Sequence, residues 1–544
     1  AFAMERHYQY DPLSNIIGIS SFQATHPSGG ALGGPVEHTY LYDNYNRLTH
    51  AEGYYVGPDD EVPDMLKQAY SLDMEYDLSH NILEKNQLHQ FGSVTSVNQS
   101  LPATARHAQT SYRLEYSGYG TATYAHRQPH APRMITEYPQ EDYSGDPEDP
   151  RIKRKHISYD ANGNQLEIKE EVKDPSDTRG YRLQSLRKNL WDAEDRLWAV
   201  DLDPESDEDK PLVAIYTYDA GGERTIKYVP ARIDSRYSAK DAGKADRFES
   251  IIYPNALLTA KTLEFPEITG QEKDPRIMTY TKHYYIGSER IVSVLGTKRG
   301  MGAYCATERA AVRDELNDKV TAAGEAIEEV FEYFGKHIQL PQPFVYSDSN
   351  AYPCSSTQVP EDYGAYWYHP DHLGSSSYIT NLDGEISQHM EYLPFGETLV
   401  EEHLNSNNSP YKFNAKEFDA ETGNYYYGAR YYDPKWSIWM SVDPLAEEFP
   451  SWSSYSFSFN NPIGFVDPDG RAPLNVVGDP PGKVIAVFYH GGPTGGGKQT
   501  TVANAGYTGN IYTNTQSSAT NSGRNFTGTI IAPGATSASG VSTG

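Results

Sequence analysis

Basic residues and long apolar runs are both scarce in this sequence of 544 residues. Lys and Arg number 46 against 74 Asp and Glu, and the resulting net charge of −28 excludes a nucleic-acid binder that works by bulk positive charge. No run approaches the roughly 18 apolar residues of a membrane-spanning helix, so we expect no membrane span. The first residues, AFAMERHYQY, lack a signal-peptide pattern and begin in mid-pattern, so we expect a fragment of a longer protein.

Apolar residues are also few, at 38%, and the mean hydropathy is −0.67. Disorder does not explain this composition, because the chain has 44 Tyr, 17 Phe and 6 Trp, and disordered chains are poor in aromatic residues. Aromatic residues together with 45 Gly and 35 Pro favour many short strands joined by turns. A compact globule of this length needs a larger apolar share or several domains, so we looked for repeats.

An aromatic residue followed by Asp recurs along the first half of the chain. The pairs are Tyr10-Asp11, Tyr42-Asp43, Tyr76-Asp77, Tyr159-Asp160, Trp191-Asp192 and Tyr218-Asp219, with a degenerate copy at Tyr116-Ser117. The strand-like segments before them, such as HTYLYD, alternate between two faces, and the residues after them, such as ANGN, suit a tight turn with positive φ. Each repeat therefore predicts a β-hairpin, in which the Tyr and Asp side chains are scaffold and the Asp bonds its own turn.

The pattern becomes helical between residues 308 and 334. Apolar residues recur there at intervals of three and four, and Gly335 suits the end of a helix. We expect an inserted helix, within about residues 306–335, packed on or inside the sheet. Cys305 and Cys354 flank it and are the only cysteines; a disulfide across the insertion and two unpaired thiols remain open alternatives.

Residues 365–470 have the most specific sequence. It includes AYWYHPDHLGSSSYITNLDGEISQHMEYLPFGE, then NYYYGARYYDPKWSIWMSVDPLAEEF, then SYSFSFNNPIGFVDPDG. This block closely resembles the core-domain signature of Rhs and YD-repeat proteins, and the resemblance covers roughly residues 8–470. It implies a long antiparallel β-sheet that spirals into a hollow shell, which in bacteria commonly encloses a variable C-terminal toxin. We expect a mainly β fold, with a repeat shell at 1–364, a core-associated domain at 365–470 and a variable segment at 471–544.

The resemblance also implies an intramolecular aspartyl protease. The matching residues are Arg430, Asp443 and Asp467, where two carboxylates would share a proton and the Arg would bias their ionisation. The sequence departs from the family pattern at two places: Ala446 replaces the Gly of the first Asp-Pro motif, and Arg471 stands where the family often has Leu before the cut. The alternative is that both Asp residues only begin Asp-Pro turns.

Residues 471–544 differ sharply in composition, being rich in Gly, Thr, Ser and Asn. The segment carries a charge of +3 and the rest of the chain −31. We therefore expect a cargo inside the shell, extended or incompletely folded, with Arg471, Lys483, Lys498 and Arg524 near acidic wall residues. The alternative is that the acidic residues lie on the outer face and serve solubility.

Two motifs in this segment suggest chemistry. Gly492 to Lys498 fits part of a phosphate-binding loop, but Gln499 stands where such loops need Ser or Thr, so we expect no nucleotide cofactor and no metal. His490, Gly491 and Gly492 after a strand resemble the oxyanion turn of α/β-hydrolases. Gly540 to Gly544 matches Gly-x-Ser-x-Gly but lacks the strand-to-helix context, so a hydrolase would need a chain that continues beyond residue 544.

We therefore expect a secreted or cell-surface carrier that encloses its own C-terminal segment as an effector and releases it by autoproteolysis. Its expected partners are that segment, an immunity protein and a secretion machinery, with no nucleic acid bound by the shell. Two alternatives remain open: a structural or adhesive surface protein without a toxin, and a carrier of a truncated α/β-hydrolase.

Overall fold

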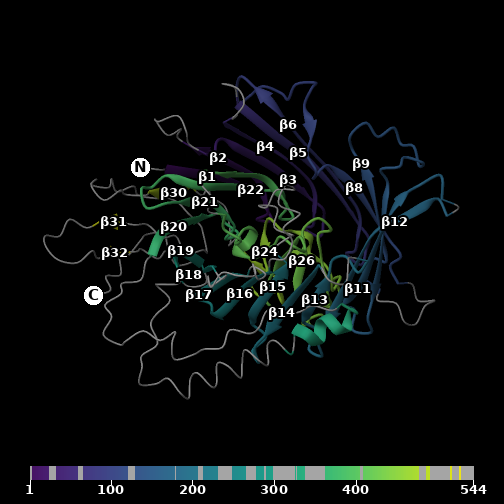
Figure 1. Cartoon of the computed structure of the whole chain (residues 1–544). Coiled ribbons are helices and arrows are strands. Elements are labelled where there is room, and N and C mark those ends of the chain that lie inside the picture. Colours follow the sequence, from purple (N-terminus) through teal and green to yellow (C-terminus); the bar gives the residue numbers. More distant parts are fainter. Residues whose placement is uncertain are drawn as a thin grey trace, which may run out of the picture.

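The computed structural model describes residues 3–23, 32–58, 65–120, 129–177, 179–205, 212–230, 248–264, 277–286, 289–297, 325, 327–336, 362–404, 408–476, 485–489, 515–516 and 526–527. Within these residues the fold is mainly β, as expected, and one sheet of 24 strands dominates it (Figure 1). None of the described helical residues forms a helix that is long and apolar enough to cross a membrane.

The strands of this sheet follow one another along the chain. They are β1 (Ala3–Tyr10), β2 (Ile16–Gln23), β3 (Val36–Tyr42), β4 (Leu48–Pro58), β5 (Met65–Tyr76), β6 (Ile82–Val94), β7 (Arg106–His107), β8 (Tyr112–Ser117), β9 (Met134–Pro139), β10 (Lys153–Tyr159), β11 (Gln165–Lys173), β12 (Tyr181–Trp191), β13 (Leu197–Asp201), β14 (Val213–Tyr218), β15 (Arg224–Pro230), β16 (Phe248–Asn255), β17 (Leu258–Glu264), β18 (Ile277–Ile286), β19 (Glu289–Thr297), β20 (Asp362–Pro370), β21 (Ser376–Thr380), β22 (Ile386–Tyr392), β23 (Thr398–His403) and β30 (Ile485–Tyr489).

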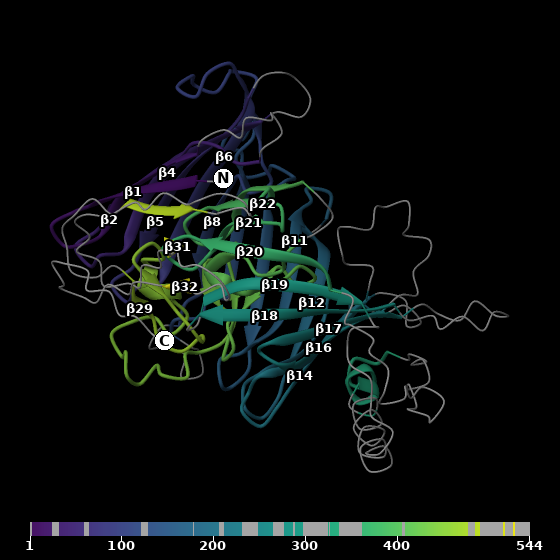
Figure 2. The same ribbon diagram turned by 90° about the vertical axis from the view of Figure 1, so that its left-hand side faces the viewer.

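We call this 24-stranded sheet the wall. Each of its strands pairs antiparallel with the next one along the chain, with two exceptions. Strands β7 and β8 both pair with β6, and β30 pairs with β1. The wall is not closed into a barrel within the described residues, because β23 is paired there only with β22, and β30 only with β1. It curves so strongly that its first strands lie beside its last ones (Figure 2). Arg6 in β1 donates to Ser377 in β21 at 2.8 Å and to Glu391 in β22 at 2.9 Å.

The turns explain the repeat. In each of the six copies the third residue after the Asp has positive φ: Ser14, Asn46, His80, Gly163, Asp195 and Gly222. The Asp Oδ1 accepts backbone N–H groups of its own turn, as Asp11 does from Leu13 and Asn15 at 2.9 and 2.8 Å. The residue four positions on binds the second oxygen, as Arg47 Nε does to Asp43 Oδ2 at 2.7 Å. The prediction of hairpins with a left-handed turn residue is confirmed.

The Tyr of a repeat links it to the repeat before. The Tyr42 hydroxyl donates to the Ile16 carbonyl at 2.7 Å, Tyr76 to Leu48 at 2.8 Å, and Tyr218 to Leu197 at 2.6 Å. Each accepting carbonyl lies at the first residue of the strand after the preceding turn. The ring covers apolar surface while its hydroxyl binds main chain, so these Tyr residues are scaffold, as expected.

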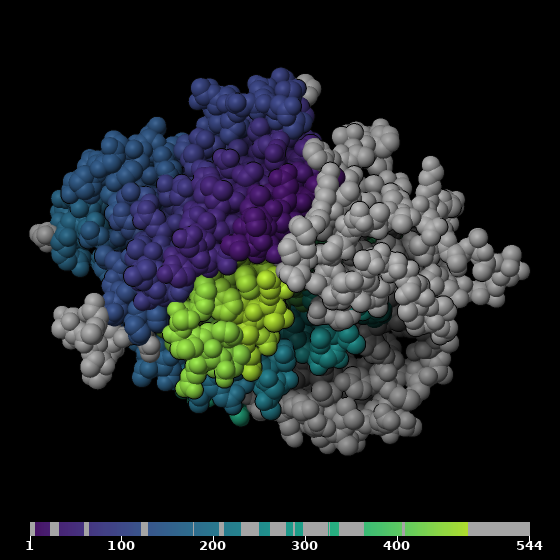
Figure 3. Space-filling model, turned by 180° about the vertical axis from the view of Figure 1, so that it is seen from behind, coloured from purple at the N-terminus to yellow at the C-terminus, as the bar shows by residue number. Residues whose placement is uncertain are grey.

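A compact inner block, residues 408–476, fills part of the concave side of the wall (Figures 1 and 2). It contains short strands and two 3-10 turns: η4 (Phe413–Ala415), β24 (Glu417–Asp419), β25 (Asn424–Tyr426), β26 (Tyr431–Asp433), β27 (Ile438–Trp439), η5 (Phe457–Asn460), β28 (Phe465–Val466) and β29 (Leu474–Asn475). Outside the wall and the block, β31 (Thr515–Gln516) pairs with β32 (Phe526–Thr527). Side chains of the wall and the block form one apolar cluster, which includes Leu72 and Leu114 of the wall and Trp439 and Phe457 of the block. The shell is therefore not hollow where the block lies. Figure 3 shows the block against the first strands of the wall at one face of the molecule.

The inserted helix is described at residues 327–333, within the expected range. Val330 and Phe331 pack on one face of β13–β15, against Val213 and Ile215. Ala214 and Tyr216, which alternate with them, face the inner block. These strands are thus buried on both faces, and the helix covers the face opposite the block.

Truncation of Phe331 should weaken the packing of the helix on strands β13–β15. We expect Phe331→Ala to lower the free energy of unfolding by about 3 kcal/mol, because the ring is 2% exposed and its removal leaves a cavity. Tyr333→Ala is the matched control, since that ring is 63% exposed and should cost less than about 0.5 kcal/mol. Urea denaturation of both variants measures the difference, and equal losses would show that the helix does not depend on this face.

Several expectations concern residues outside the described ranges. These are Cys305, Cys354, Lys483, His490, Gly491, Gly492, Lys498, Gln499, Arg524 and the Gly540–Gly544 motif. The disulfide, the oxyanion turn, the phosphate loop and the position of the cargo's positive charges therefore stay predictions, as does the division of the chain at residues 364 and 470.

Candidate functional site

The three residues expected to form a protease meet inside the inner block. Arg430 precedes β26, Asp443 follows β27, and Asp467 follows β28. Arg430 Nη2 lies 2.8 Å from Asp443 Oδ2 and 3.2 Å from Asp467 Oδ2, so the two carboxylates share one guanidinium nitrogen. Arg430 and Asp467 are fully buried, and the Asp443 side chain is nearly so.

The same residues hold one peptide group from both ends. Arg430 Nε donates to the Gly470 carbonyl oxygen at 2.5 Å. The amide N–H of Arg471, the next residue, donates to Asp467 Oδ1 at 3.0 Å. Carbonyl and amide of the Gly470–Arg471 peptide are therefore both bound by candidate catalytic groups.

The loop around this peptide is tightly fixed. Asp467 Oδ1 also accepts from the Gly470 amide at 2.7 Å, and the Ala429 amide donates to the Asp469 carbonyl at 2.9 Å. Gly470 has φ of +78°, and a Cβ there would lie 2.9 Å from the backbone nitrogen of Arg430. Glycine is thus required at the end of the second Asp-Pro motif.

The two departures from the family pattern have structural answers. Ala446 is not among the residues with positive φ, and its amide donates to the Asp443 carbonyl at 3.0 Å, so the first turn forms without glycine. The Arg471 side chain is 54% exposed, and its Nε lies 3.9 Å from the carboxylate of the similarly exposed Asp469. No tight side-chain contact therefore selects Leu over Arg at this position in the structure.

Burial sets the ionisation of the site. It raises the pKa of Asp443, which Arg430 counteracts and the nearby Asp467 carboxylate reinforces. Burial also lowers the pKa of Arg430, although both carboxylates oppose this. The guanidinium carbon lies 4.0 Å from the centre of the Trp439 ring, which stacks on it and excludes water from that side. The arrangement provides a carbonyl polarised by Arg430 and two carboxyl groups held on one guanidinium nitrogen.

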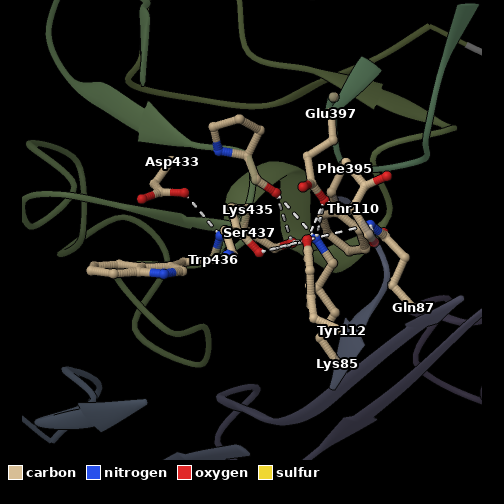
Figure 4. A network of polar contacts seen from close by, with 12 residues as sticks. Lys85, Gln87, Thr110, Tyr112, Phe395, Glu397, Asp433, Lys435, Trp436 and Ser437 are labelled. Atoms are coloured by element: carbon tan, nitrogen blue, oxygen red, sulfur yellow. Dashed lines mark hydrogen bonds and ion pairs between the residues drawn. The ribbon is translucent and has the colours of Figure 1, made fainter. Parts of the chain in front are cut away.

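A buried lysine joins the wall to the inner block, and no sequence motif predicted this role for it. Lys85, in β6, donates to Glu397 at 3.0 Å, to Ser437 at 3.1 Å and to the carbonyls of Pro434 and Lys435 at 3.2 and 3.1 Å. Figure 4 shows this lysine reaching from the wall into the turn that follows β26. Gln87 and Tyr112 donate to the same Glu397 oxygen.

Three repeat turns hold the loop between the two Asp residues. The Tyr455 hydroxyl donates to the Gly163 carbonyl at 2.6 Å, and Asn460 donates to the His80 carbonyl at 3.0 Å. Asn461 Nδ2 donates to Asn15 Oδ1 at 3.4 Å. The His80 ring also stacks on Trp452 with ring centres 4.0 Å apart. The geometry of Asp443 and Asp467 thus depends on turns more than 270 residues away in the sequence.

A metal ion has no evident place in the described part of the chain, where no three His, Cys, Asp or Glu side chains gather as ligands.

Known proteins resemble this chain in sequence over short stretches and in fold over most of its length. Toxin subunit YenC2 of Yersinia entomophaga is 38% identical over 112 residues, which is 20% of this chain and 11% of the relative. The tRNA nuclease WapA of Bacillus subtilis is 31% identical over 110 residues, 20% of this chain and 5% of the relative. The crystal structure of TcdB2-TccC3 covers 85% of this chain and 17% of its own, with a TM-score of 0.50 and 19% identity. No family model matches the chain.

These similarities support the resemblance to Rhs and YD-repeat proteins that the sequence motifs indicate. The chain spans only about a tenth of the length of the Yersinia relatives. The likeness in fold extends to a second crystal structure, TcdB2-TccC3 without its hypervariable C-terminal region, with a TM-score of 0.50 and 18% identity over 85% of this chain. The wall and block described above are thus the fold of such a shell.

Proposed function

We propose that the inner block is an intramolecular aspartyl protease that cuts the chain beside Gly470. One observation carries this proposal: Arg430 and Asp467 bind the carbonyl and the amide of the same peptide, Gly470–Arg471. An Asp-Pro turn alone would explain the bonds that Asp467 makes to its own loop, but not a buried arginine on the carbonyl. The contacts favour the Gly470–Arg471 bond, whereas the family resemblance puts the cut one residue later.

The chemistry follows from these contacts. Ionised Asp467 takes a proton from a water molecule, whose hydroxyl adds to the Gly470 carbonyl carbon. Arg430 stabilises the oxyanion that forms, because its Nε already lies on that oxygen. Asp467 then passes the proton to the Arg471 nitrogen, 3.0 Å from its Oδ1, and the C–N bond breaks to leave a carboxylate and an amine. Asp443, whose pKa is raised by burial, binds the same guanidinium nitrogen as Asp467 and holds Arg430 in place.

The cut would free residues 471–544 as an effector segment. Two relatives are toxin subunits, one is a tRNA nuclease, and the TcdB2-TccC3 structure has a hypervariable C-terminal region. We therefore infer a toxin-associated carrier that encloses its C-terminal segment and acts outside the cell that makes it. Its further partners would be an immunity protein and a secretion machinery.

Denaturing electrophoresis with intact-mass analysis tests the cleavage. We expect the unmodified chain to give two fragments and Asp467→Asn to cut at least about a hundredfold more slowly, because the amide cannot accept the proton of water. Asp443→Asn should also slow the reaction, because it removes one of the two carboxylates that hold Arg430 in place. Asp469→Asn is the matched control, since this carboxylate is 63% exposed and its ion pair, at 3.9 Å, is with the exposed side chain of Arg471. The fragment masses distinguish a cut before Arg471 from one after it. An uncut unmodified chain would reject the proposal.

A further inference from the structure

A small cavity lies where strands β1–β3 meet the turn after β20 and the inner block. Its apolar lining includes Ile19 of β2, Val36 of β3, Leu393 after β22, and Phe413 and Ile463 of the block. The cavity leaves about 30 Å³ for the centres of water-sized groups, whereas one water molecule needs about 10–15 Å³ on this measure. It therefore has room for about two water molecules.

The polar part of the lining carries charges of both signs. It consists of Arg6, Ser21, His38, Asp371, His372 and Glu391. Several of these side chains already bond one another or their neighbours. Arg6 Nη2 donates to Glu391 at 2.9 Å, and His38 Nδ1 lies 3.0 Å from the Tyr70 hydroxyl. Asp371 Oδ1 accepts two backbone amides of its own turn.

Three polar atoms of the same lining have no hydrogen-bond partner among the described residues. They are Arg6 Nε, Ser21 Oγ and His372 Nδ1. Arg6 and Ser21 are 5% and 1% exposed, and they lie opposite each other in the ladder between β1 and β2. Unsatisfied polar groups are costly at such burial, so three of them around one cavity indicate a ligand that bonds them.

The three atoms define the chemistry of that ligand. Arg6 Nε can only donate. His372 Nε2 lies 3.0 Å from the Ile463 carbonyl oxygen and therefore carries the ring hydrogen, and burial lowers the pKa of His372, so Nδ1 of the neutral ring is an acceptor.

The ligand must thus accept from an arginine and donate to a histidine. An anion cannot donate to His372 Nδ1, and it would meet the carboxylates of Asp371 and Glu391 in the same cavity. A metal cation cannot accept from Arg6. Water can do both, and the Ser21 hydroxyl can bond it as donor or as acceptor.

We propose that this cavity is a binding site for about two ordered water molecules, which accept from Arg6, bond the Ser21 hydroxyl and donate to His372. The water molecules join β1 and β2 to the turn after β20, and His372 extends the link to the inner block through its bond to Ile463. They complement the direct bonds of Arg6 to Ser377 and Glu391. The water site is independent of the proposed autoproteolysis.

A crystal structure of the full chain, at a resolution that shows ordered water and with a second crystal soaked in bromide, tests the site. We expect water density within about 3.2 Å of Arg6 Nε, Ser21 Oγ and His372 Nδ1, and no anomalous bromide peak. An empty cavity would overturn the proposal, and so would a bromide peak, which would identify an anion site.

The variant Ser21→Val tests the site in solution. It removes the hydroxyl and places a larger apolar side chain in the cavity, which displaces water and leaves Arg6 Nε and His372 Nδ1 unsatisfied. Ser20→Val is the matched control, because it makes the same change in the same strand on the opposite face of the sheet.

Urea denaturation compares the two variants. We expect the equilibrium constant for unfolding to be at least roughly tenfold larger for Ser21→Val than for Ser20→Val. A dry cavity predicts the opposite order, because Val would fill space and remove an unsatisfied hydroxyl. Stability of Ser21→Val equal to or above that of the control would therefore overturn the proposal.

Discussion

Lys227→Met should lower the free energy of unfolding by about 3–5 kcal/mol, because it removes a cation from a buried charge cluster. Lys227, in β15, lies 2.5 Å from Asp419 and 3.1 Å from Glu421 of the inner block. Arg224 binds the other Asp419 oxygen at 2.7 Å and Glu417 at 2.9 Å. Two cations thus face three carboxylates, and all of these side chains are at most 6% exposed.

The pKa directions support this balance. Burial alone would lower the pKa of Lys227, but Asp419, Glu421 and Glu417 outweigh it and raise that pKa. Burial and the neighbouring Asp419 raise the pKa of Glu421, which Lys227 opposes. Without Lys227 the three carboxylates would face Arg224 alone, and Glu421 would take up a proton more readily. The destabilisation of Lys227→Met should therefore shrink as the pH falls.

Urea denaturation followed by tryptophan fluorescence measures this loss. Arg113→Met is the matched control, because the ion pair of Arg113 with Glu115 is partly exposed and should contribute less than about 1 kcal/mol. Adding Glu421→Gln to Lys227→Met restores the balance of charge and should recover part of the stability. A loss for Lys227→Met no larger than that of Arg113→Met would show that the wall and the block are not joined by this cluster.

The repeats could be predicted from sequence because their causes are local. An Asp that bonds its own turn, followed by a residue with positive φ, needs contacts only within five residues, and the structure confirms this at Ser14, Asn46 and His80. The mainly β shell followed from the repeat and the resemblance. The sequence did not predict that residues 408–476 fill part of the shell. Composition does not distinguish an empty concave face from one that a later part of the same chain covers.

The candidate site could be predicted as a set of residues but not as a geometry. Arg430, Asp443 and Asp467 were identified from motifs, and the structure brings them together. Nothing near Lys85 or His80 in the sequence marks them as partners of the block, because their contacts join segments more than 340 residues apart. The sequence did not predict the pairing of β30 with β1 either. Main-chain hydrogen bonds join the two strands, and such bonds leave no pattern of side chains in the sequence.

Mild acid should destabilise the shell, because several of its histidines are buried in the neutral form. Burial lowers the pKa of His38 and of His89 to about 4 and that of His283 to about 3. Neighbouring charges modify this effect of burial: Glu391 raises the pKa of His38 and Arg6 lowers it, Glu397 raises that of His89, and Arg290 lowers that of His283.

The sign of the effect follows from the two states. Below the ordinary histidine pKa of 6.5, the unfolded chain binds protons that the folded chain does not, so stability falls as the pH drops from about 6.5 towards 4. Each of these histidines contributes up to about 3 kcal/mol to the loss. His389 acts in the opposite sense, because Glu391 and Glu402 overcome the effect of burial and raise its pKa. Its contribution is present in acid and is lost as the pH rises through the raised value, so it opposes the loss caused by the other three.

The triple variant His38→Gln, His89→Gln, His283→Gln tests this account. The amides can keep hydrogen bonds but cannot be protonated, so we expect the variant to be less stable at pH 7.5 and to lose much less stability on acidification to about pH 4.5. His156→Gln is the control, since this partly exposed ring lies on the surface beside Glu171 and should leave the pH profile unchanged. Urea midpoints across this pH range give the slopes. An equally steep loss in the triple variant would assign acid sensitivity to the carboxylates of the wall and not to its histidines.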